Sequence, residues 1–281
     1  MTSVMMPAST PRSTGTGTRR LTRLPSGAPV SVALLQGNIS QDIKFREEML
    51  PKMFMDYLAM TEAAKAQLIV LPESAFPVFA HELPEELPRR LGEHARKNGG
   101  DVLYGVFDAN LETRDIFNAV WSVGSAPAQS YRKHHLVAFG EFIPAKPLIG
   151  WIYNSILNMP LADQTPGPAY QKPLAGQRVA VNICYEDAFG SEIIRQLPEA
   201  TLLVNVSNDG WFGDSLGPQQ HLQIAQMRSI ETGRYLLRGT NTGLTAIIDE
   251  RGRLSARAPQ FEVATLHGTA QGFQGATPYV K

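Results

Sequence analysis

The sequence predicts a layered α/β or α+β domain. Short apolar runs, which are typical of buried strands, alternate with segments of helical spacing, and consecutive strands follow later in the chain. The chain has 281 residues, of which 43% are hydrophobic, so it is long enough to bury a sizeable core. It contains no internal repeat, and no run approaches the roughly 18 apolar residues of a membrane-spanning helix.

The expected elements follow one another from residue 30 onward. The first strand covers 31–36 with its flanks, because this apolar run ends at the turn residues Gly37 and Asn38. Met49, Met53, Tyr57 and similar residues at helical spacing predict a helix within 44–65. Further helices are expected at 84–97, 190–196 and 218–233, and further strands at 68–71, 101–107, 117–123, 129–133, 179–184, 202–207, 235–240 and 244–249.

The first 28 residues differ from the rest of the chain in composition. They are rich in Ser, Thr, Pro and Gly, and the Arg19-Arg20 pair is not followed by the apolar stretch of a signal peptide. We therefore expect a disordered leader or linker at 1–28 and one catalytic domain at 29–281.

Charge and cysteine content exclude some classes of protein. The 26 basic residues balance 26 acidic ones, so no overall positive field favours nucleic-acid binding. The single cysteine rules out an intramolecular disulfide, which leaves the compartment open. His134 and His135 are adjacent on a strand and point to opposite faces, so we expect neither a bound metal nor another cofactor.

The segment 146–162 carries an apolar helical face that includes Ile149, Ile152 and Ile156. One interpretation is a helix in the core or at a subunit interface. The other is an arm that enters a membrane surface or grips an acyl chain. The sequence leaves both open.

Three residues with complementary chemistry follow three predicted strands. Glu73 lies just after the strand at 68–71, Lys133 ends the strand at 129–133, and Cys184 ends the strand at 179–184. Carboxyl ends of strands are where α/β proteins place ligands, so a carboxylate, an ammonium and a thiol can meet at one edge. A thiol attacks a carbonyl as thiolate, and this requires a base and a positive neighbour. Cys184 is thus a candidate nucleophile rather than an inert buried thiol.

The motifs around these residues resemble those of the nitrilase (carbon–nitrogen hydrolase) superfamily. Within it, the sequence is most similar to the catalytic domain of the bacterial apolipoprotein N-acyltransferases. The matching stretches are LLQGNI (34–39), LPESAFP (71–77), YRKHHLVAFGEFIP (131–144), VNICYEDAFG (181–190), NVSNDGWFGDSLGPQQHLQIAQMRSIETGRYLLRGTNTG (205–243) and GATPYVK (275–281).

The resemblance implies a four-layer αββα sandwich with Glu73 as base, Lys133 as electrostatic partner and Cys184 as nucleophile. It also assigns a second carboxylate to Glu141, which we expect to orient Lys133 or Glu73. Supporting roles then fall on the residues after the nucleophile and on the turn after the strand at 202–207, namely Tyr185, Glu186, Asn208, Asp209 and Trp211. His221 either serves the site or caps the helix at 218–233, and the helix interpretation is slightly favoured.

The family differs from this chain in two respects. Its members carry membrane-spanning helices before and after this domain, and a tryptophan that often follows the LLQGNI segment is Phe45 here. We expect the chain to act as one part of such an enzyme or by itself, and the sequence does not choose between these.

The resemblance implies N-acylation of lipoproteins. A phospholipid would donate the acyl group, Cys184 would carry it as a thioester, and the N-terminal S-diacylglyceryl-cysteine of a lipoprotein would accept it. This predicts the periplasm-facing side of a bacterial inner membrane. The alternative is a soluble, cytoplasmic amidase that uses the same three residues. A degenerate interaction domain would show a damaged triad, whereas Glu73, Lys133 and Cys184 are all present.

Overall fold

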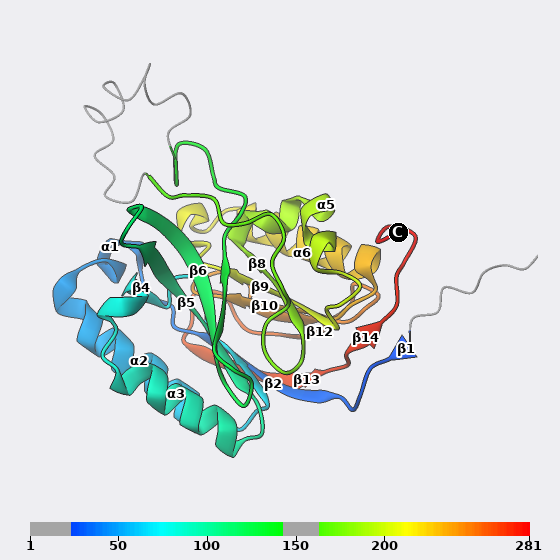
Figure 1. The fold of residues 1–281 in the computed structure, drawn as a ribbon, viewed down its shortest axis with the longest axis horizontal. Coiled ribbons are helices and arrows are strands. Elements are labelled where there is room, and N and C mark those ends of the chain that lie inside the picture. Colours follow the sequence, from blue (N-terminus) through cyan, green and yellow to red (C-terminus); the bar gives the residue numbers. More distant parts are fainter. Residues whose placement is uncertain (1–23, 143–162) are drawn as a thin grey trace, which may run out of the picture.

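The computed structural model describes residues 24–142 and 163–281. The segment predicted to be helical at 146–162 lies outside the described residues. Figure 1 shows the arrangement of the elements. The helices are α1 (Gln41–Lys44), η1 (Glu47–Met49), α2 (Leu50–Ala63), η2 (Ala80–Glu82), α3 (Glu86–Lys97), η3 (Cys184–Ala188), α5 (Gly190–Ile193), η4 (Ile194–Gln196), η5 (Gly210–Phe212) and α6 (Gly217–Thr232).

Most strands belong to two mixed sheets. One sheet has the order β13-β2-β3-β5-β6-β7, with β4 paired to β5, and the other has the order β12-β11-β10-β9-β8. The strands are β1 (Leu24–Pro25), β2 (Val30–Gln36), β3 (Leu68–Val70), β4 (Phe76–Phe79), β5 (Asp101–Asn110), β6 (Asp115–Gly124), β7 (Gln129–Arg132), β8 (Val179–Ile183), β9 (Leu202–Ser207), β10 (Leu236–Thr240), β11 (Ala246–Ile248), β12 (Leu254–Arg257), β13 (Ala264–Ala270) and β14 (Phe273–Gln274).

The centre of each sheet is parallel. β2, β3 and β5 run parallel in the first sheet, and β8, β9 and β10 run parallel in the second. Antiparallel strands flank both groups. The carboxyl ends of the central strands therefore lie together within each sheet.

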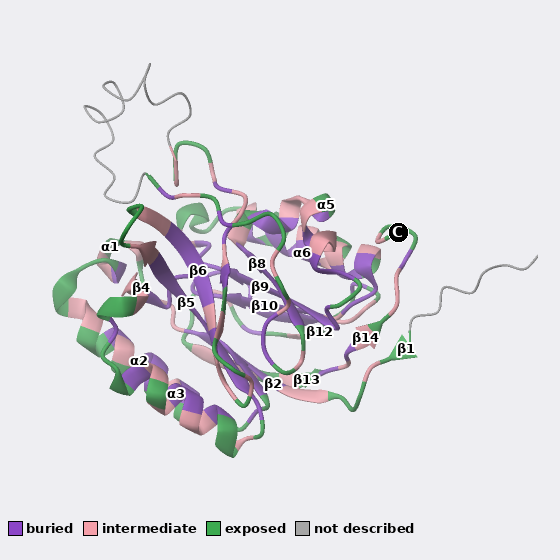
Figure 2. Ribbon diagram, viewed as in Figure 1, coloured by how far each residue is buried: buried purple, intermediate pink, exposed green. Residues whose placement is uncertain are grey.

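Three apolar clusters separate four layers. The first cluster joins side chains from both sheets, so the sheets pack face to face. The second packs α2 and α3 against the first sheet, and the third packs α5 and α6 against the second. Figure 2 shows the buried residues concentrated along the strands and on the inner faces of the helices. This arrangement confirms the expected four-layer αββα sandwich.

The alternation of side chains explains why the central strands read as continuous apolar runs. Val32 and Leu34 of β2 enter the cluster between the sheets, whereas Ala33 and Leu35 face α2 and α3. Both faces of the sheet are covered, so neither set of alternate residues is polar.

The helix predicted within 44–65 is confirmed as α2, and it covers only part of that range. The region divides into α1, η1 and α2, and α2 begins at Leu50 with Pro51 in its first turn. Proline has no backbone N–H and its ring clashes with a preceding helical turn, so it begins a helix rather than continuing one. The predicted helix at 190–196 is likewise split into α5 and η4.

The sequence analysis did not predict several strands, because they contain few buried apolar residues. β12 is almost wholly exposed, and β13 is mostly exposed or half-buried. β1 lies within the segment assigned to the leader, where Leu24 and Pro25 pair with β14. Among the residues that the structure describes, no helix has the length and apolar character to cross a membrane.

Gly105 of β5 allows the loop that carries Glu73 to approach the sheet. A Cβ atom at this position would lie 2.5 Å from the carbonyl oxygen of Pro72 and 2.8 Å from the carbonyl carbon of Glu73. Ser74 adopts φ 47°, so this loop is already tightly turned. Both contacts are with backbone, which cannot rotate away.

We predict that Gly105→Ala lowers the free energy of unfolding by about 1–3 kcal/mol, because the added methyl group must displace the Glu73 loop. Urea unfolding of the variant measures this. Gly176→Ala is the matched control, since a Cβ there meets only Asp101 Oδ2, at 3.4 Å. Equal effects of the two substitutions would contradict the proposed close approach.

Candidate active site

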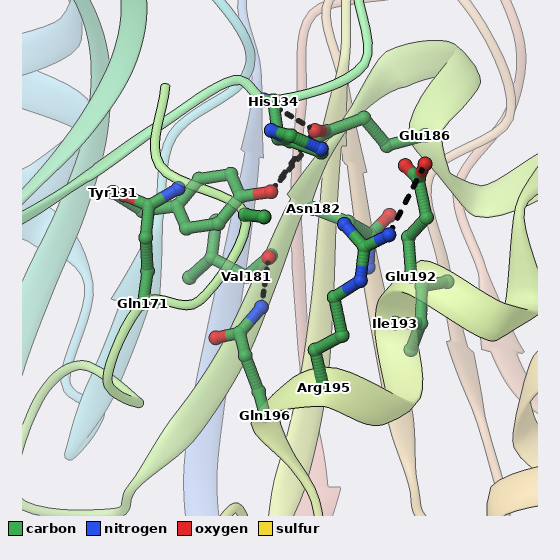
Figure 3. A pocket seen from close by; sticks show the side chains of 11 residues that line it. Tyr131, His134, Gln171, Val181, Asn182, Glu186, Glu192, Ile193, Arg195 and Gln196 are labelled. Atoms are coloured by element: carbon green, nitrogen blue, oxygen red, sulfur yellow. Dashed lines mark hydrogen bonds and ion pairs between the residues drawn. The ribbon is translucent and has the colours of Figure 1, made fainter. Parts of the chain in front are cut away.

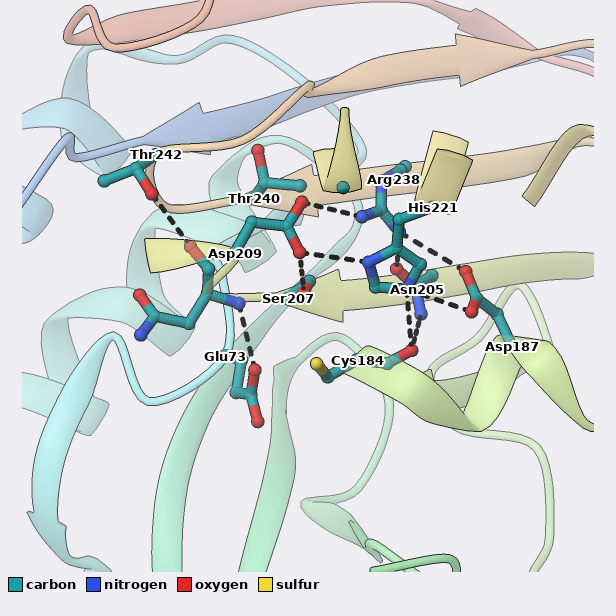
Figure 4. Close-up of polar contacts among 12 residues, drawn as sticks. Glu73, Cys184, Asp187, Asn205, Ser207, Asp209, His221, Arg238, Thr240 and Thr242 are labelled. Carbon is teal, nitrogen blue, oxygen red and sulfur yellow. Dashed lines mark hydrogen bonds and ion pairs between the residues drawn. The ribbon is translucent and has the colours of Figure 1, made fainter. Parts of the chain in front are cut away.

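Three reactive side chains leave the ends of three strands at one edge of the sandwich. Glu73 lies just beyond β3, Lys133 directly follows β7, and Cys184 directly follows β8. Lys133 Nζ is 3.8 Å from Glu73 Oε1, and both charges act on the Cys184 thiol. In Figure 4 the sulfur of Cys184 points toward the side of the site where Glu73 lies. The structure therefore brings together the three residues singled out in the sequence.

Cys184 occupies a sharp turn between strand and helix. It is the first residue of η3 and adopts φ 53°, a left-handed conformation that non-glycine residues rarely take. The turn raises the half-buried thiol from the end of β8. It also leaves the first N–H groups of η3 at the start of a helical turn, where such groups lack partners within the helix. These are the groups that an oxyanion on a bound acyl carbon would need.

Glu73 is held on three sides. Asn118 Nδ2 donates to Oε1 at 2.7 Å, and the backbone N–H of Asn208 donates to Oε2 at 2.9 Å. The buried Lys44 donates to the Glu73 carbonyl oxygen at 3.0 Å. The side chain of Asn208 turns away to bind Gln41 Oε1 at 2.6 Å. Asn208 thus contributes its backbone to the site.

Lys133 lies between two carboxylates. Its Nζ donates to Glu141 Oε1 at 2.6 Å, and the other oxygen of Glu141 accepts the N–H of Val137 at 2.8 Å. Burial alone would lower the pKa of Lys133, but Glu73 and Glu141 raise it above its ordinary value. These two carboxylates therefore favour the charged form of Lys133. Glu141 was expected to orient either Lys133 or Glu73, and in the structure it contacts Lys133.

The surroundings of Cys184 favour the protonated, neutral form of its thiol. Burial raises the pKa of Cys184 well above its ordinary value, the Glu73 carboxylate raises it further, and the Lys133 ammonium only partly opposes them. A protonated thiol beside a carboxylate needs that carboxylate as a general base.

Glu186 ties the strand end that carries Lys133 to the turn that carries Cys184. Its carboxylate accepts the N–H groups of His134 at 2.7 Å, His135 at 3.0 Å and Ile183 at 2.7 Å, and the hydroxyl of Tyr131 at 3.0 Å. Burial raises the pKa of Glu186, whereas these N–H groups lower it. Its four donors make Glu186 a structural support for the site.

Glu186 also lines a small cavity. Figure 3 shows it between Tyr131, His134 and Gln171 on one side and Glu192 and Arg195 on the other. Its volume is about 20 Å³, enough for a water molecule and too small for an acyl chain. None of Glu73, Lys133 and Cys184 lines this cavity.

Tyr185 and Trp211 lie at the surface beside the site. Tyr185 is 46% exposed and packs edge-on against Phe189, while Trp211 in η5 is 67% exposed. Asp209 turns inward instead, toward Arg238 and the site's interior. The turn after β9 therefore presents the aromatic side chains of Trp211 and Phe212 outward and the carboxylate of Asp209 inward.

The preference for His221 as a helix cap is wrong. α6 begins at Gly217, so His221 lies inside it, and its ring contacts Asp187, Asp209 and the carbonyl oxygen of Cys184. His221 thus contacts the backbone of Cys184 and does not cap the helix.

Sequence reasoning missed several residues that support the triad. Lys44 and Asn118 gave no signal, because each lies in an ordinary sequence context. Arg238 did give one, since a charged residue inside the apolar strand LLRGT must be buried with a partner. Among residues 24–142 and 163–281, no group of three His, Cys, Asp or Glu side chains is placed to hold a metal ion.

We predict that Glu141→Gln lowers the free energy of unfolding by about 3 kcal/mol, because it leaves the buried Lys133 with one distant counter-charge. Glu62→Gln is the control, as Glu62 pairs with Arg90 at the same 2.6 Å but its side chain is 37% exposed, against 14% for Glu141. The control should cost less than about 1 kcal/mol. Equal losses in urea unfolding would show that burial of the Lys133 pair is unimportant.

Known proteins share both the sequence and the fold. The chain is 55% identical to an apolipoprotein N-acyltransferase of Nitrosomonas europaea over 92% of its own length and 52% of the relative, and 46% identical to one of Methylococcus capsulatus over 91% and 51%. The chain thus spans about half the length of these curated relatives. A CN-hydrolase superfamily protein from Xanthomonas campestris shares the fold with a TM-score of 0.64 at 17% identity, over 87% of this chain and 91% of that one.

The family model for carbon–nitrogen hydrolases matches residues 31–272, which include every strand from β3 to β13 and all three triad residues. The chain belongs to the carbon–nitrogen hydrolase family.

Proposed function

We propose that this chain catalyses acyl transfer through a thioester on Cys184. The donor is a membrane phospholipid, and the acceptor is the N-terminal S-diacylglyceryl-cysteine of a lipoprotein. One observation carries the chemistry: the only thiol of the chain lies beside a buried carboxylate and a buried ammonium. Similarity to proteins named apolipoprotein N-acyltransferase supports the substrates.

The first half-reaction forms the thioester. Glu73 takes the proton of the Cys184 thiol, and the thiolate attacks the ester carbonyl of the phospholipid. Lys133 and the backbone N–H near Tyr185 stabilise the resulting oxyanion. When the tetrahedral intermediate collapses, the C–O bond to the lysophospholipid breaks, and the leaving oxygen receives the proton held by Glu73.

The second half-reaction releases the acyl group to the acceptor. The α-amine of the lipoprotein attacks the thioester carbonyl and gives a proton to Glu73. The C–S bond then breaks, and Glu73 returns that proton to the departing sulfur of Cys184. The amide product leaves and the enzyme is back in its resting state, with atoms and charge balanced.

Exposed apolar side chains next to the site favour a lipid donor. Tyr185 follows Cys184 directly, and Trp211, Phe212 and Leu216 lie in the segment between β9 and α6, with Leu216 73% exposed. Phe139, in the loop after Lys133, is 54% exposed. Exposed apolar residues in segments that adjoin the triad residues in the chain fit contact with a membrane surface. We propose the periplasm-facing side of a bacterial inner membrane as the location.

The rival function is a soluble amidase that delivers water to the thioester, by way of the same three residues. The triad itself does not distinguish the two, because both begin with an acyl-enzyme. The exposed aromatic side chains of the turn after β9 favour the lipid substrate.

We predict that the chain forms an acyl adduct with labelled phospholipid and that hydroxylamine removes it, because hydroxylamine cleaves thioesters. Cys184→Ala should form none, since the chain has no other thiol. Glu73→Gln and Lys133→Met should slow adduct formation on the order of a hundredfold or more.

Mass spectrometry of the intact protein in phospholipid vesicles measures the adduct. A hydroxylamine-sensitive adduct on the Cys184→Ala variant would refute the assigned nucleophile. Transfer from the wild-type adduct to a diacylglyceryl-cysteine peptide supports the acceptor. Hydrolysis of small amides, with no adduct from phospholipid, would establish the amidase instead.

A further inference from the structure

Four buried charged side chains form a closed network behind Cys184, and the triad chemistry does not use them. They are Asp187 in η3, Asp209 after β9, His221 in α6 and Arg238 in β10. Arg238, Asp187 and Asp209 are at most 2% exposed, and His221 is 6% exposed. Figure 4 shows the four side chains converging from these separate elements.

The contacts within the network are specific. Arg238 Nη2 donates to Asp209 Oδ2 at 2.8 Å, and Nη1 contacts Asp187 Oδ2 at 3.4 Å and Asn205 Oδ1. His221 Nδ1 lies 3.0 Å from Asp209 Oδ1, and its Nε2 lies 3.0 Å from Asp187 Oδ1. Each carboxylate is thus shared by one histidine and one arginine.

Both ring nitrogens of His221 face acceptors. Nδ1 faces a carboxylate, and Nε2 faces a second carboxylate and the carbonyl oxygen of Cys184, at 3.2 Å. A neutral imidazole has one nitrogen without a proton, which would direct its lone pair at one of these oxygens. Only the imidazolium donates to all of them. Two cations and two carboxylates then give the network zero net charge.

The network acts on the backbone of the nucleophile. Cys184 adopts φ 53°, a conformation that costs free energy and persists only where neighbouring groups stabilise it. Its carbonyl oxygen accepts from Asn205 Nδ2 at 3.0 Å as well as from His221. Asn205 is in turn held by Arg238. The carbonyl of this left-handed residue is thus bound by one member of the network, His221, and by Asn205, which Arg238 contacts.

We propose that His221 is a doubly protonated positioning residue: its imidazolium, balanced by Asp187, Asp209 and Arg238, holds the carbonyl of Cys184 and so fixes the turn that presents the thiol to Glu73. The proposal concerns the geometry of the nucleophile, and it applies to the acyl transfer proposed above whatever the acyl donor.

Electrostatics agree with this geometry. Burial and Arg238 oppose protonation of His221, but hydrogen bonds to Asp187 and Asp209 raise its pKa above the ordinary value. Burial would also raise the pKa of Asp209, yet Arg238 and His221 hold it below the ordinary value. With a raised pKa, the stabilisation from His221 is complete below pH 6.5 and is lost as the pH rises through the folded-state pKa.

The first test observes the protonation directly and needs no variant. NMR of the chain labelled in its histidines follows the two ring nitrogens of His221 with pH. We expect a titration midpoint above the ordinary value of 6.5, with both nitrogens protonated below that midpoint. A neutral tautomer that persists down to pH 6.5, or a midpoint at or below 6.5, would overturn the proposal.

The second test measures acylation of Cys184 by p-nitrophenyl acetate, which needs no lipid. His221→Gln should slow acylation on the order of a hundredfold, because the turn is no longer held. The double variant His221→Gln with Asp209→Asn removes one charge of each sign and should recover part of this loss. His94→Gln is the control, since that ring contacts Ala64 in another layer.

The outcomes separate the two proposals. Acylation of His221→Gln at the wild-type rate, or a double variant no faster than the single one, overturns the positioning role. If the wild-type chain reacts with the acetate ester as expected but forms no adduct with phospholipid, the proposed lipid function fails and the role of His221 stands. Should His221→Gln fail to fold, the NMR titration still decides its protonation.

Discussion

The site depends on buried charged side chains, each of which lies beside side chains of opposite charge. Lys133 is stable beneath the surface because Glu73 and Glu141 flank it, and Arg238 because it bridges two aspartates. Removing one partner from such a group leaves a charge in a medium that solvates it poorly. The balance therefore fixes where the strand ends lie relative to one another. The first sheet contributes Lys133 and Glu73, the second contributes Arg238 and Asp209, and the charges of Lys133, Glu73 and Asp209 all act on Cys184.

Much of the fold could be predicted from the sequence because the central strands are apolar on both faces. β2, β3, β8 and β9 lie where their apolar runs indicated, and the triad follows from what comes directly after such strands. The edge strands lacked this signal, since β12 and β13 expose many of their residues. His221 and Asp187 could not be assigned, because their partners come from elements that meet only in three dimensions.

A protonated resting thiol gives Glu73 a definite task. Many reactive cysteines rest as thiolates beside a cation. Here burial and the Glu73 carboxylate outweigh the effect of Lys133 on the Cys184 thiol. The thiolate therefore forms as the proton moves to Glu73, and Lys133 is left to stabilise the oxyanion. The same carboxylate can then handle the proton of the leaving group and that of the attacking amine.

The most direct measurement of this account is the pH dependence of Cys184 alkylation by iodoacetamide, which reports one site because the chain has one cysteine. The account predicts little thiolate reactivity at pH 7 and a rate that still rises beyond pH 9.0, the ordinary value for a thiol. A rate that reaches its plateau below pH 7 would show a resting thiolate paired with Lys133, and would contradict the role of Glu73 as the base.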